Sequence, residues 1–425
     1  MLIEDYLFGL LCHTEGQAKK VIKIQNELKN NWVLLFSASI GVICSSIVLP
    51  FYSLGALVVP ITQEFGWSRA EFQLALLFST GAGVVTAPLV GIFLDKVGIR
   101  KMALIGLFGL SASLSLASQL NGELWMLYLI YALMAILGAG TIPVTWTRAV
   151  TNVFSKQRGL ALGIMLSGTG ICAIVIPQIT VFVTEHFGWR VAYLVLAALP
   201  AGLAGPLVLL FFRPTESSDD SQELDDEVRA GLTFKEAMKG YRFWVLLISI
   251  FVVYIAMSGM VPNLIPALID QGINPQLAAT AISVFGVTVI LGRLVVGYLV
   301  DIAWAPGVAA FAIGLPVIGS LILAGSPPFF TACVAAGLLG FAAGAELDLM
   351  SFLAAKYFGL LNYSQIYAVL YAALALASGL APMLFARIFD KYGSYEIGFT
   401  IGALFFAAGA LMVLTLGRYP KSFSR

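Results

Sequence analysis

The chain has 425 residues, of which 60% are hydrophobic and 11% are charged, and its formal net charge is +1. This composition excludes an ordinary soluble domain, and the balanced charge gives no sign of nucleic-acid binding. The four cysteines lie far apart without the spacing of a metal site, so we expect neither a disulfide nor a metal ion.

Apolar stretches longer than the roughly 18 residues of a membrane-spanning helix recur along the chain. In order, they predict twelve transmembrane spans at 32–62, 71–94, 102–119, 124–150, 159–184, 189–212, 243–269, 277–300, 304–324, 328–355, 363–388 and 395–417. Backbone amides in lipid must be satisfied within a segment, so we predict an all-α membrane protein. Glycines such as the pair Gly159 and Gly163 are expected to mark close helix contacts or kinks.

Basic residues are distributed unequally over the two sides of these spans. With the N-terminus inside, eighteen of the 24 Lys and Arg residues lie in cytoplasmic segments, four lie outside, and Arg148 and Arg293 lie within spans. The positive-inside rule therefore predicts that both termini are cytoplasmic. Residues 1–31 lack a small-residue cleavage site, and we interpret them as a cytoplasmic tail.

The chain also contains an internal repeat. A shift of 206 positions places Gly66 on Gly272, Gly91 on Gly297 and Asp95 on Asp301, and a shift of 205 places Pro177 on Pro382 and Gly188 on Gly393. The repeat predicts two pseudo-symmetric six-helix bundles, at 32–213 and 241–418, with an acidic cytoplasmic linker at 214–240 and a cytoplasmic tail at 419–425. Two like halves are typical of a transporter that exposes a midplane site to each side in turn.

Four ionisable residues lie inside the apolar spans: Arg148, Arg293, Glu346 and Asp348. A charge at mid-membrane costs at least about 2.5–3.5 kcal/mol, so each is a candidate functional residue. Arg293 lies about 12 Å above the cytoplasmic end of its helix, within reach of a central cavity. Its planar donors suit a substrate carboxylate, and a structural ion pair with Glu346 or Asp348 is the alternative. Arg148 is expected either to bind anions or to extend toward the inner surface.

Glu346 and Asp348 are two positions apart, which turns them about 200° around one helix. One is therefore expected to line the cavity while the other contacts a neighbouring helix. Burial disfavours a carboxylate and a nearby arginine favours it, so such a group can exchange a proton as substrate arrives. We favour Glu346 as the proton carrier because its chain reaches further, and a structural role for both acids is the alternative.

Further candidates for substrate contact are polar or aromatic. They are Tyr52 and Ser53 on the first span, Trp146 on the fourth, Asn263 on the seventh and Tyr371 on the eleventh. Helix packing is an equal alternative for each of them. Asn263 follows Pro262, where a kink frees backbone carbonyls.

Several motifs resemble a known family. Gly91-Ile-Phe-Leu-Asp95-Lys96-Val-Gly98-Ile-Arg100-Lys101 is similar to the signature between helices 2 and 3 of the major facilitator superfamily. Motifs over most of residues 60 to 400 resemble its bacterial monocarboxylate-porter-like group: Gly66-Trp67-Ser68-Arg69, Arg158-Gly159-Leu160-Ala161-Leu162-Gly163, Gly188-Trp189-Arg190, Gly292-Arg293, Tyr357-Phe358-Gly359 and Tyr392-Gly393-Ser394-Tyr395. The resemblance implies the major facilitator fold, a bacterial inner membrane, and proton-linked movement of small organic acids, with Arg293 meeting the substrate carboxylate.

The signature also suggests a gate. Asp95 can pair with basic side chains or a helix terminus and close the cytoplasmic side in one state, while Arg100 favours the inner surface. Gly91, Gly98 and the repeat-related Asp301 complete the predicted gate. Topological anchoring alone is the alternative.

The chain departs from the group at other positions. Animal members carry an aspartate four residues before the helix 8 arginine, where this chain has Val289. Residues 32–60 lack the helix 1 lysine of those members, and residues 366–383 lack the lysine of the related oxalate/formate exchangers. These differences disfavour a dianion held between two cations. The segment 167–171 also lacks the Gly-Pro pair of drug-exporting relatives, which makes multidrug antiport less expected.

We therefore predict a secondary active transporter that works by alternating access and takes up a small organic monocarboxylate with a proton, as a monomer in the lipid bilayer. No nucleophile beside a histidine, phosphate loop or metal cluster is recognisable in the sequence, so we expect no enzymatic activity and no cofactor. Two alternatives stay open: an efflux porter for drugs or other organic ions, since a buried acid can hold a cation, and a non-transporting membrane sensor of the same fold.

Overall fold

The computed structural model describes residues 29–154, 158–212, 231–359 and 361–420. Most of the predicted tail at 1–31 and of the linker at 214–240 lies outside these residues, as do residues 421–425. Regular structure in the described part is helical apart from an isolated bridge between Gly231 and Gly359. The predicted all-α class is thus confirmed.

The first half begins with a helix over residues 29–43, and a short turn separates it from α2 (Val48–Phe65). The chain continues through α3 (Arg69–Gln73), α4 (Ala75–Val97), α5 (Ile99–Ala117), α6 (Leu124–Leu137), the 3-10 turn η1 (Ala139–Thr141), α7 (Pro143–Thr151), α8 (Arg158–Leu166), α9 (Gly168–Phe187), α10 (Trp189–Ala198), the π-helical η2 (Leu199–Ala204) and α11 (Gly205–Phe211).

The second half has longer, uninterrupted helices. They are α13 (Tyr241–Asp270), α14 (Pro275–Ile302), α15 (Ala305–Ala324), α16 (Phe329–Phe358), α17 (Tyr363–Tyr392) and α18 (Glu396–Leu414). They follow a short helix, α12 (Phe234–Lys239), which lies inside the predicted linker and was not expected. A capping box, in which Thr233 and Glu236 each bond the other's backbone amide, accounts for α12.

The predicted spans all correspond to helices or to runs of consecutive helices. Ten helical segments of the described chain are long and apolar enough to cross a membrane. The other two predicted spans, 71–94 and 124–150, are formed by α3 with α4 and by α6, η1 and α7. The first and fourth spans are both interrupted where they meet. At this point the amide of Ser46 in the first span donates to the hydroxyl of Thr141 in the fourth (2.9 Å) in place of a helical acceptor.

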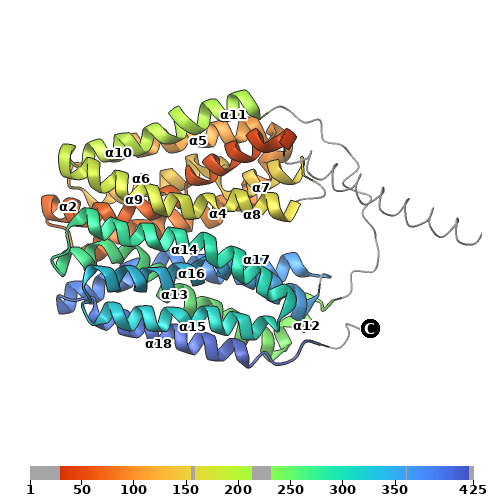
Figure 1. Ribbon diagram of the computed structural model, residues 1–425. Helices are drawn as coiled ribbons and strands as arrows, with labels where there is room; N and C mark the ends of the chain where they lie inside the picture. Colours follow the sequence, from red (N-terminus) through yellow and green to blue (C-terminus); the bar gives the residue numbers. More distant parts are fainter. Residues whose placement is uncertain (1–28, 155–157, 213–230, 360, 421–425) are drawn as a thin grey trace, which may run out of the picture.

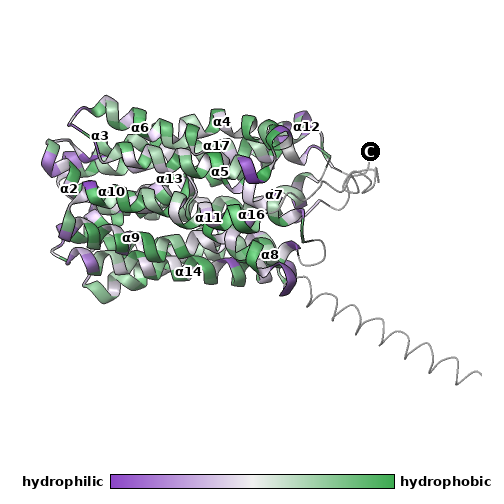
Figure 2. Cartoon of the chain, turned by 90° about the horizontal axis from the view of Figure 1, so that it is seen from above, coloured by the Kyte–Doolittle hydropathy of each residue, from purple (hydrophilic) through white to green (hydrophobic). Residues whose placement is uncertain are grey.

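The helices form two bundles of six spans, which Figure 1 shows one above the other. We call the end of the molecule that carries α12 and the last described residue, Pro420, the terminal face, and the opposite end the distal face. Apolar side chains cover the length of the bundles, while hydrophilic residues gather toward the two ends (Figure 2). This is the surface of an integral, multi-pass membrane protein.

The repeat read from the sequence has a structural counterpart. The four related glycines at distal helix ends all have a positive φ: Gly66 (69°), Gly188 (86°), Gly272 (83°) and Gly393 (70°). Only glycine adopts this conformation without a steric penalty, which explains why the residue recurs. Pro177 and Pro382 likewise both lie inside helices, α9 and α17.

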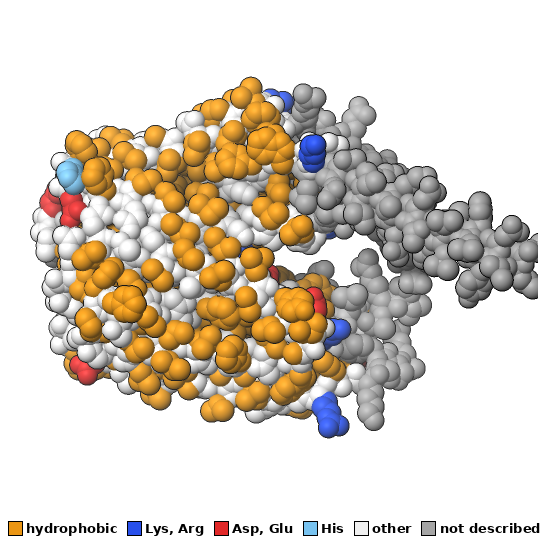
Figure 3. Space-filling model, in the orientation of Figure 1, with side chains coloured by type: hydrophobic (Ala, Val, Ile, Leu, Met, Phe, Trp, Pro, Cys, Tyr) orange, Lys and Arg blue, Asp and Glu red, His pale blue; other side chains and the backbone are white. Residues whose placement is uncertain are grey.

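The two halves pack closely from the midplane to the distal face, where α2 meets α13, α9 meets α14, and α17 meets α3 and α4. Glycines allow this approach: a Cβ on Gly286 would lie 2.6 Å from the carbonyl oxygen of Gly170, and one on Gly55 would lie 2.7 Å from that of Pro262. Toward the terminal face, by contrast, Figure 3 shows the surface hollowed between the halves. We call this hollow the cleft.

Two predicted small-residue contacts are absent from this arrangement. Cβ atoms on Gly159 and Gly163 would have no described atom within 4 Å. Of the two expectations for this pair, the close helix contact is therefore wrong for this conformation. The pair lies on α8, which begins at the terminal face where the halves are apart.

Candidate functional site

The centre of the site is the contact between Arg293 of α14 and Asp348 of α16. These helices approach closely because glycines line their contact: Cβ atoms on Gly292 and Gly344 would lie 2.0 Å from the carbonyl oxygens of Phe341 and Val289. Nε of Arg293 lies 3.5 Å from Oδ2 of Asp348. The ion pair that the sequence left as an alternative for Arg293 is present, and Asp348 is the partner.

The two members of this pair differ in exposure and in hydrogen bonding. The Arg293 side chain is 9% exposed, whereas that of Asp348 is 43% exposed although it lies about 15 Å from the end of α16. Asp348 therefore reaches the cleft. Nε and Nη1 of Arg293 are buried and donate no hydrogen bond to the described protein. A buried charged donor without an acceptor is costly, so the guanidinium is suited to receive an anion.

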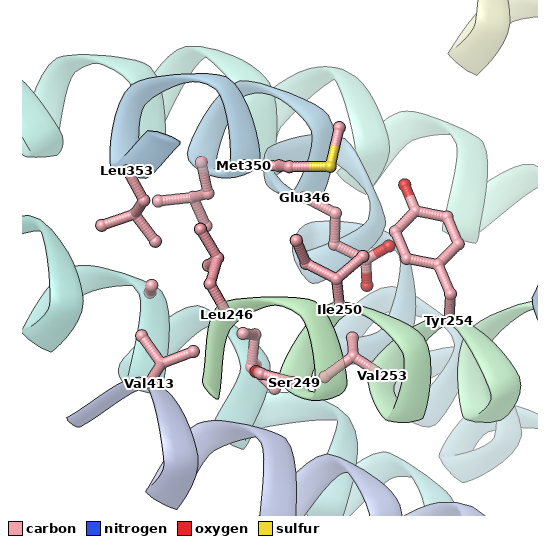
Figure 4. Close-up of a pocket in the computed structure, with 12 residues that line it drawn as sticks. Leu246, Ser249, Ile250, Val253, Tyr254, Glu346, Met350, Leu353 and Val413 are labelled. Carbon is pink, nitrogen blue, oxygen red and sulfur yellow. The ribbon is translucent and has the colours of Figure 1, made fainter. Parts of the chain in front are cut away.

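Glu346 occupies the opposite side of α16. Its side chain is buried inside the second half, and its Oε1 atom has no hydrogen-bond partner in the described protein. It borders a pocket formed with α13, where Tyr254 and Ile250 flank the carboxyl group (Figure 4). The expected division of the two acids is present: Asp348 is beside Arg293, and Glu346 is buried on another face of α16.

The spacing of small residues on α16 explains this division. Gly340, Gly344 and Asp348 are four residues apart, so they share the helix face that packs on α14. Glu346 is rotated away from that face. The pattern was visible in the sequence, but its meaning depends on knowing that α14 is the partner helix.

Aromatic residues surround these charges. The ring of Tyr52 from the first half lies 6.4 Å from that of Phe285 in the second, and Tyr52 interacts electrostatically with Arg293 and Glu346. Tyr371 is 39% exposed and stacks on Tyr367, with ring centroids 6.4 Å apart. The structure thus brings the predicted candidates Tyr52 and Tyr371 to the same region as the charges.

Two further tyrosines of this region were not singled out from the sequence. Tyr254 interacts electrostatically with Glu346, Arg293, Tyr367 and Tyr371, and Tyr367 does so with Asp348. Tyr363, Tyr367 and Tyr371 stack in turn along α17. Their spacing of four residues was the available signal, since such residues share a helix face.

Asn263 has a different environment from the one expected of a substrate ligand. It is fully buried, its Nδ2 donates to Gln73, Gly259 and Pro382, and its Oδ1 accepts from Nε2 of Gln73 at 2.6 Å. Because Gln73 belongs to the first half, Asn263 joins the halves on the distal side in this conformation.

Arg148 and Trp146 lie on α7 in the first half. Arg148 is in the last turn of this helix, where the helix dipole favours a cation, and near the terminal face. This placement supports the alternative that it extends toward the surface. Trp146 is fully buried, packs against Gly41 and donates to the carbonyl of Thr141, so its contacts are those of the bundle core.

The predicted gate residues lie at the terminal face. Gly98, with a φ of 84°, separates α4 from α5, and Arg100 donates to the carbonyl oxygen of Leu209 within the same half. Asp301 is exposed in the last turn of α14, and a Cβ on Gly91 would meet no described atom within 4 Å. The side chain of Asp95 lies outside the described residues. Gating by these residues stays a prediction for the state in which this face closes.

Comparisons with known proteins agree with this geometry. The family model described as Major Facilitator Superfamily matches residues 32–358. Monocarboxylate transporter 11 of Mus musculus is 26% identical over 386 residues, which cover 86% of this chain and 83% of that protein. The uncharacterized MFS-type transporter YcxA of Bacillus subtilis (strain 168) is 24% identical over 372 residues, covering 85% and 82%.

Solved structures show the same fold at low identity. A bacterial homolog of the human lysosomal transporter Spinster, in an inward-facing and unoccupied conformation, has a TM-score of 0.65 and 16% identity, and covers 91% of this chain and 95% of its own. The nucleoside transporter NupG has a TM-score of 0.71 and 13% identity, and covers 91% and 100%.

Proposed function

Because this chain belongs to the major facilitator superfamily, we propose that it is a secondary active transporter that carries a small organic monocarboxylate together with a proton into the cell. The observation that carries this proposal is the buried guanidinium of Arg293, whose Nε and Nη1 atoms donate no hydrogen bond to the described protein. Paired guanidinium donors match the two oxygens of a carboxylate. The monocarboxylate transporter among the relatives supports the same substrate class.

Asp348 is the competitor for this guanidinium. At 3.5 Å from Nε it partly neutralises Arg293 while the site is without substrate, and its exposure allows it to move aside into the cleft. The carboxylate of the arriving substrate then takes the place of the Asp348 carboxylate beside Arg293. Among the described residues, Arg293 is the cation beside Asp348, which favours an acid with one carboxylate because a second anionic group would need a second cation.

Glu346 is the proposed proton carrier. Ionising a carboxyl group in apolar surroundings is costly, so a buried acid at this place is suited to hold a proton. Its charge acts on Tyr52 and Tyr254, which also interact with Arg293. A proton on Glu346 therefore removes a negative charge from the neighbourhood into which the substrate anion moves.

The excess of basic residues supports a cytoplasmic terminal face, and in that orientation the open cleft is that of an inward-facing state. In this state substrate leaves Arg293 for the cytoplasm. Export of an organic cation is the weaker candidate, because the unmatched donors of Arg293 repel a positive ligand.

The test is transport in proteoliposomes. Labelled monocarboxylates should accumulate with an inward proton gradient and only equilibrate without one. Arg293→Gln should abolish transport, whereas Arg190→Gln should not, because Arg190 pairs with Glu64 inside one half at the distal face. Transport that survives Arg293→Gln, or accumulation that ignores the proton gradient, would contradict the proposal.

A further inference from the structure

The pocket beside Glu346 includes neither Arg293 nor Asp348 in its lining. It lies inside the second half, between α13, α15, α16 and α18, and has a volume of about 30 Å³. Most of its lining is aliphatic, and the carboxyl group of Glu346 is at one end (Figure 4). The substrate ligand Arg293 does not belong to its lining.

The pocket runs along the helices toward the terminal face. Its lining residues on α13 extend from Tyr254 to Leu246, which is about 12 Å along the helix axis. Leu246 is near the beginning of α13, and Val413 is next to the last residue of α18. The end remote from Glu346 is therefore close to the terminal face.

Two features distinguish this pocket from a dry packing void. Oε1 of Glu346 is buried without a hydrogen-bond partner in the described protein. The hydroxyl of Ser249 donates to the carbonyl of Gly409 (3.1 Å) and keeps its lone pairs for another donor. A cavity of this volume has room for about one or two waters, and water enters cavities that offer polar partners.

Few titratable groups face Glu346 from the surrounding helices. Tyr254 faces it from α13 and Tyr52 from α2, and Arg293 of α14 is engaged by Asp348. Tyr367 and Tyr371 of α17 lie beyond Tyr254. The residues of α15 and α18 that line the pocket, Ala309, Ile313 and Val413, are apolar.

We propose that this pocket is the proton exit: water entering it from the terminal face takes the proton from Glu346, while the substrate leaves Arg293 through the cleft. The inference rests on the proposed function and adds the route. The O–H bond of Glu346 breaks, a bond to the water oxygen forms, and Glu346 is left as a carboxylate. Because the routes are separate, the proton can leave while the cleft is still occupied.

The test fills the pocket. Ile250→Phe adds bulk next to the Glu346 carboxyl group, and Ile248→Phe is the matched control, since Ile248 lies on the same helix and is 46% exposed. Two rates are measured in proteoliposomes: substrate counterflow, which needs no proton release, and accumulation driven by a proton gradient. We expect Ile250→Phe to lower the accumulation rate by about tenfold and leave counterflow within about twofold of the unsubstituted protein, and Ile248→Phe to change neither.

The outcomes separate the route from the function. Unchanged accumulation in Ile250→Phe, or an equal loss of counterflow and accumulation, would overturn the proposed route. Absence of counterflow in the unsubstituted protein would overturn the proposed function instead. In that case the pocket is still tested by labelling with an apolar carbodiimide, which should modify Glu346, fail with Glu346→Gln, and be blocked by Ile250→Phe but not by Ile248→Phe. Labelling of Ile250→Phe at the unsubstituted rate would overturn the route independently.

Discussion

Arg69 of the first half and Asp270 of the second form a bidentate ion pair at the distal face. Nη1 and Nη2 of Arg69 lie 2.5 and 2.8 Å from the two carboxylate oxygens of Asp270, and the guanidinium lies 3.9 Å above the ring of Phe389. Asp390 accepts from the backbone amides of Arg69 and Ala70 (3.1 and 2.9 Å) at the beginning of α3. These contacts hold the distal side closed.

The guanidinium of Arg69 stays protonated over the physiological pH range. Burial opposes the cation, but hydrogen bonds with Asp270 and Tyr395 more than offset this, so the pKa of Arg69 is raised. Because the pKa of Arg69 is raised, its contribution is complete below the ordinary pKa of arginine and is lost only as the pH rises above that range.

Asp270→Asn should shift the protein toward a conformation open at the distal face, because it weakens a contact between the halves that is worth about 1–3 kcal/mol. Spin labels at the exposed distal residues Asn121 and Ser326 should report longer distances in the variant. Arg190→Gln is the control, since it breaks an ion pair within one half. Identical distance distributions in Asp270→Asn and the unsubstituted protein would show that the pair does not hold this side closed.

Gly286→Ala should destabilise the conformation described here by about 1–3 kcal/mol, as overpacking does. The added Cβ would lie 2.6 Å from the carbonyl oxygen of Gly170 across the contact between the halves. Gly297→Ala, on the same helix, meets open space and serves as the control. Thermal unfolding in detergent compares the two variants, and equal transition temperatures would contradict the proposed tight contact.

Gly344→Ala should weaken binding of a monocarboxylate by about tenfold or more, because overpacking of about 1–3 kcal/mol would separate α14 from α16. The new Cβ would lie 2.0 Å from the carbonyl oxygen of Val289 and 3.0 Å from the amide of Arg293. Gly337→Ala on the same helix would make ordinary contacts of 3.5 Å and should bind normally. Titration calorimetry measures the monocarboxylate affinity of both variants. Unaltered affinity in Gly344→Ala would show that substrate binding does not depend on the contact between α14 and α16.

Asp348→Asn should tighten monocarboxylate binding by up to about tenfold, since it removes the anion that competes for Arg293. The same calorimetric titration checks this, with Asp301→Asn as the control because Asp301 is exposed at the end of α14. Weaker binding in Asp348→Asn would mean that Asp348 assists the substrate rather than competing with it.

The positions of Glu346 and Asp348 show how much of the candidate site could be predicted from the sequence. Burial of two carboxyl groups in one span was evident from hydropathy, and the two-residue spacing required them to face different ways. The sequence left open which of the two acids pairs with Arg293, and the glycines that bring α16 onto α14 turn Asp348 to it. The hydrogen bonds of Asn263 could not be predicted from the sequence either. Its partner Gln73 lies in the other half, and nothing local to either residue indicates the pairing.

By itself, the sequence determined the all-helical class, the positions of the spans, the two-fold repeat and the burial of Arg293. These follow from the hydropathy, helix-ending glycines and charge distribution of each segment, which are local properties. Only the tertiary structure decided that Asp348 pairs with Arg293, that Glu346 borders a pocket inside the second half, and that Arg69 and Asp270 join the halves. Those relationships depend on the rotation of each helix against its neighbours, and backbone contacts at small residues set that rotation.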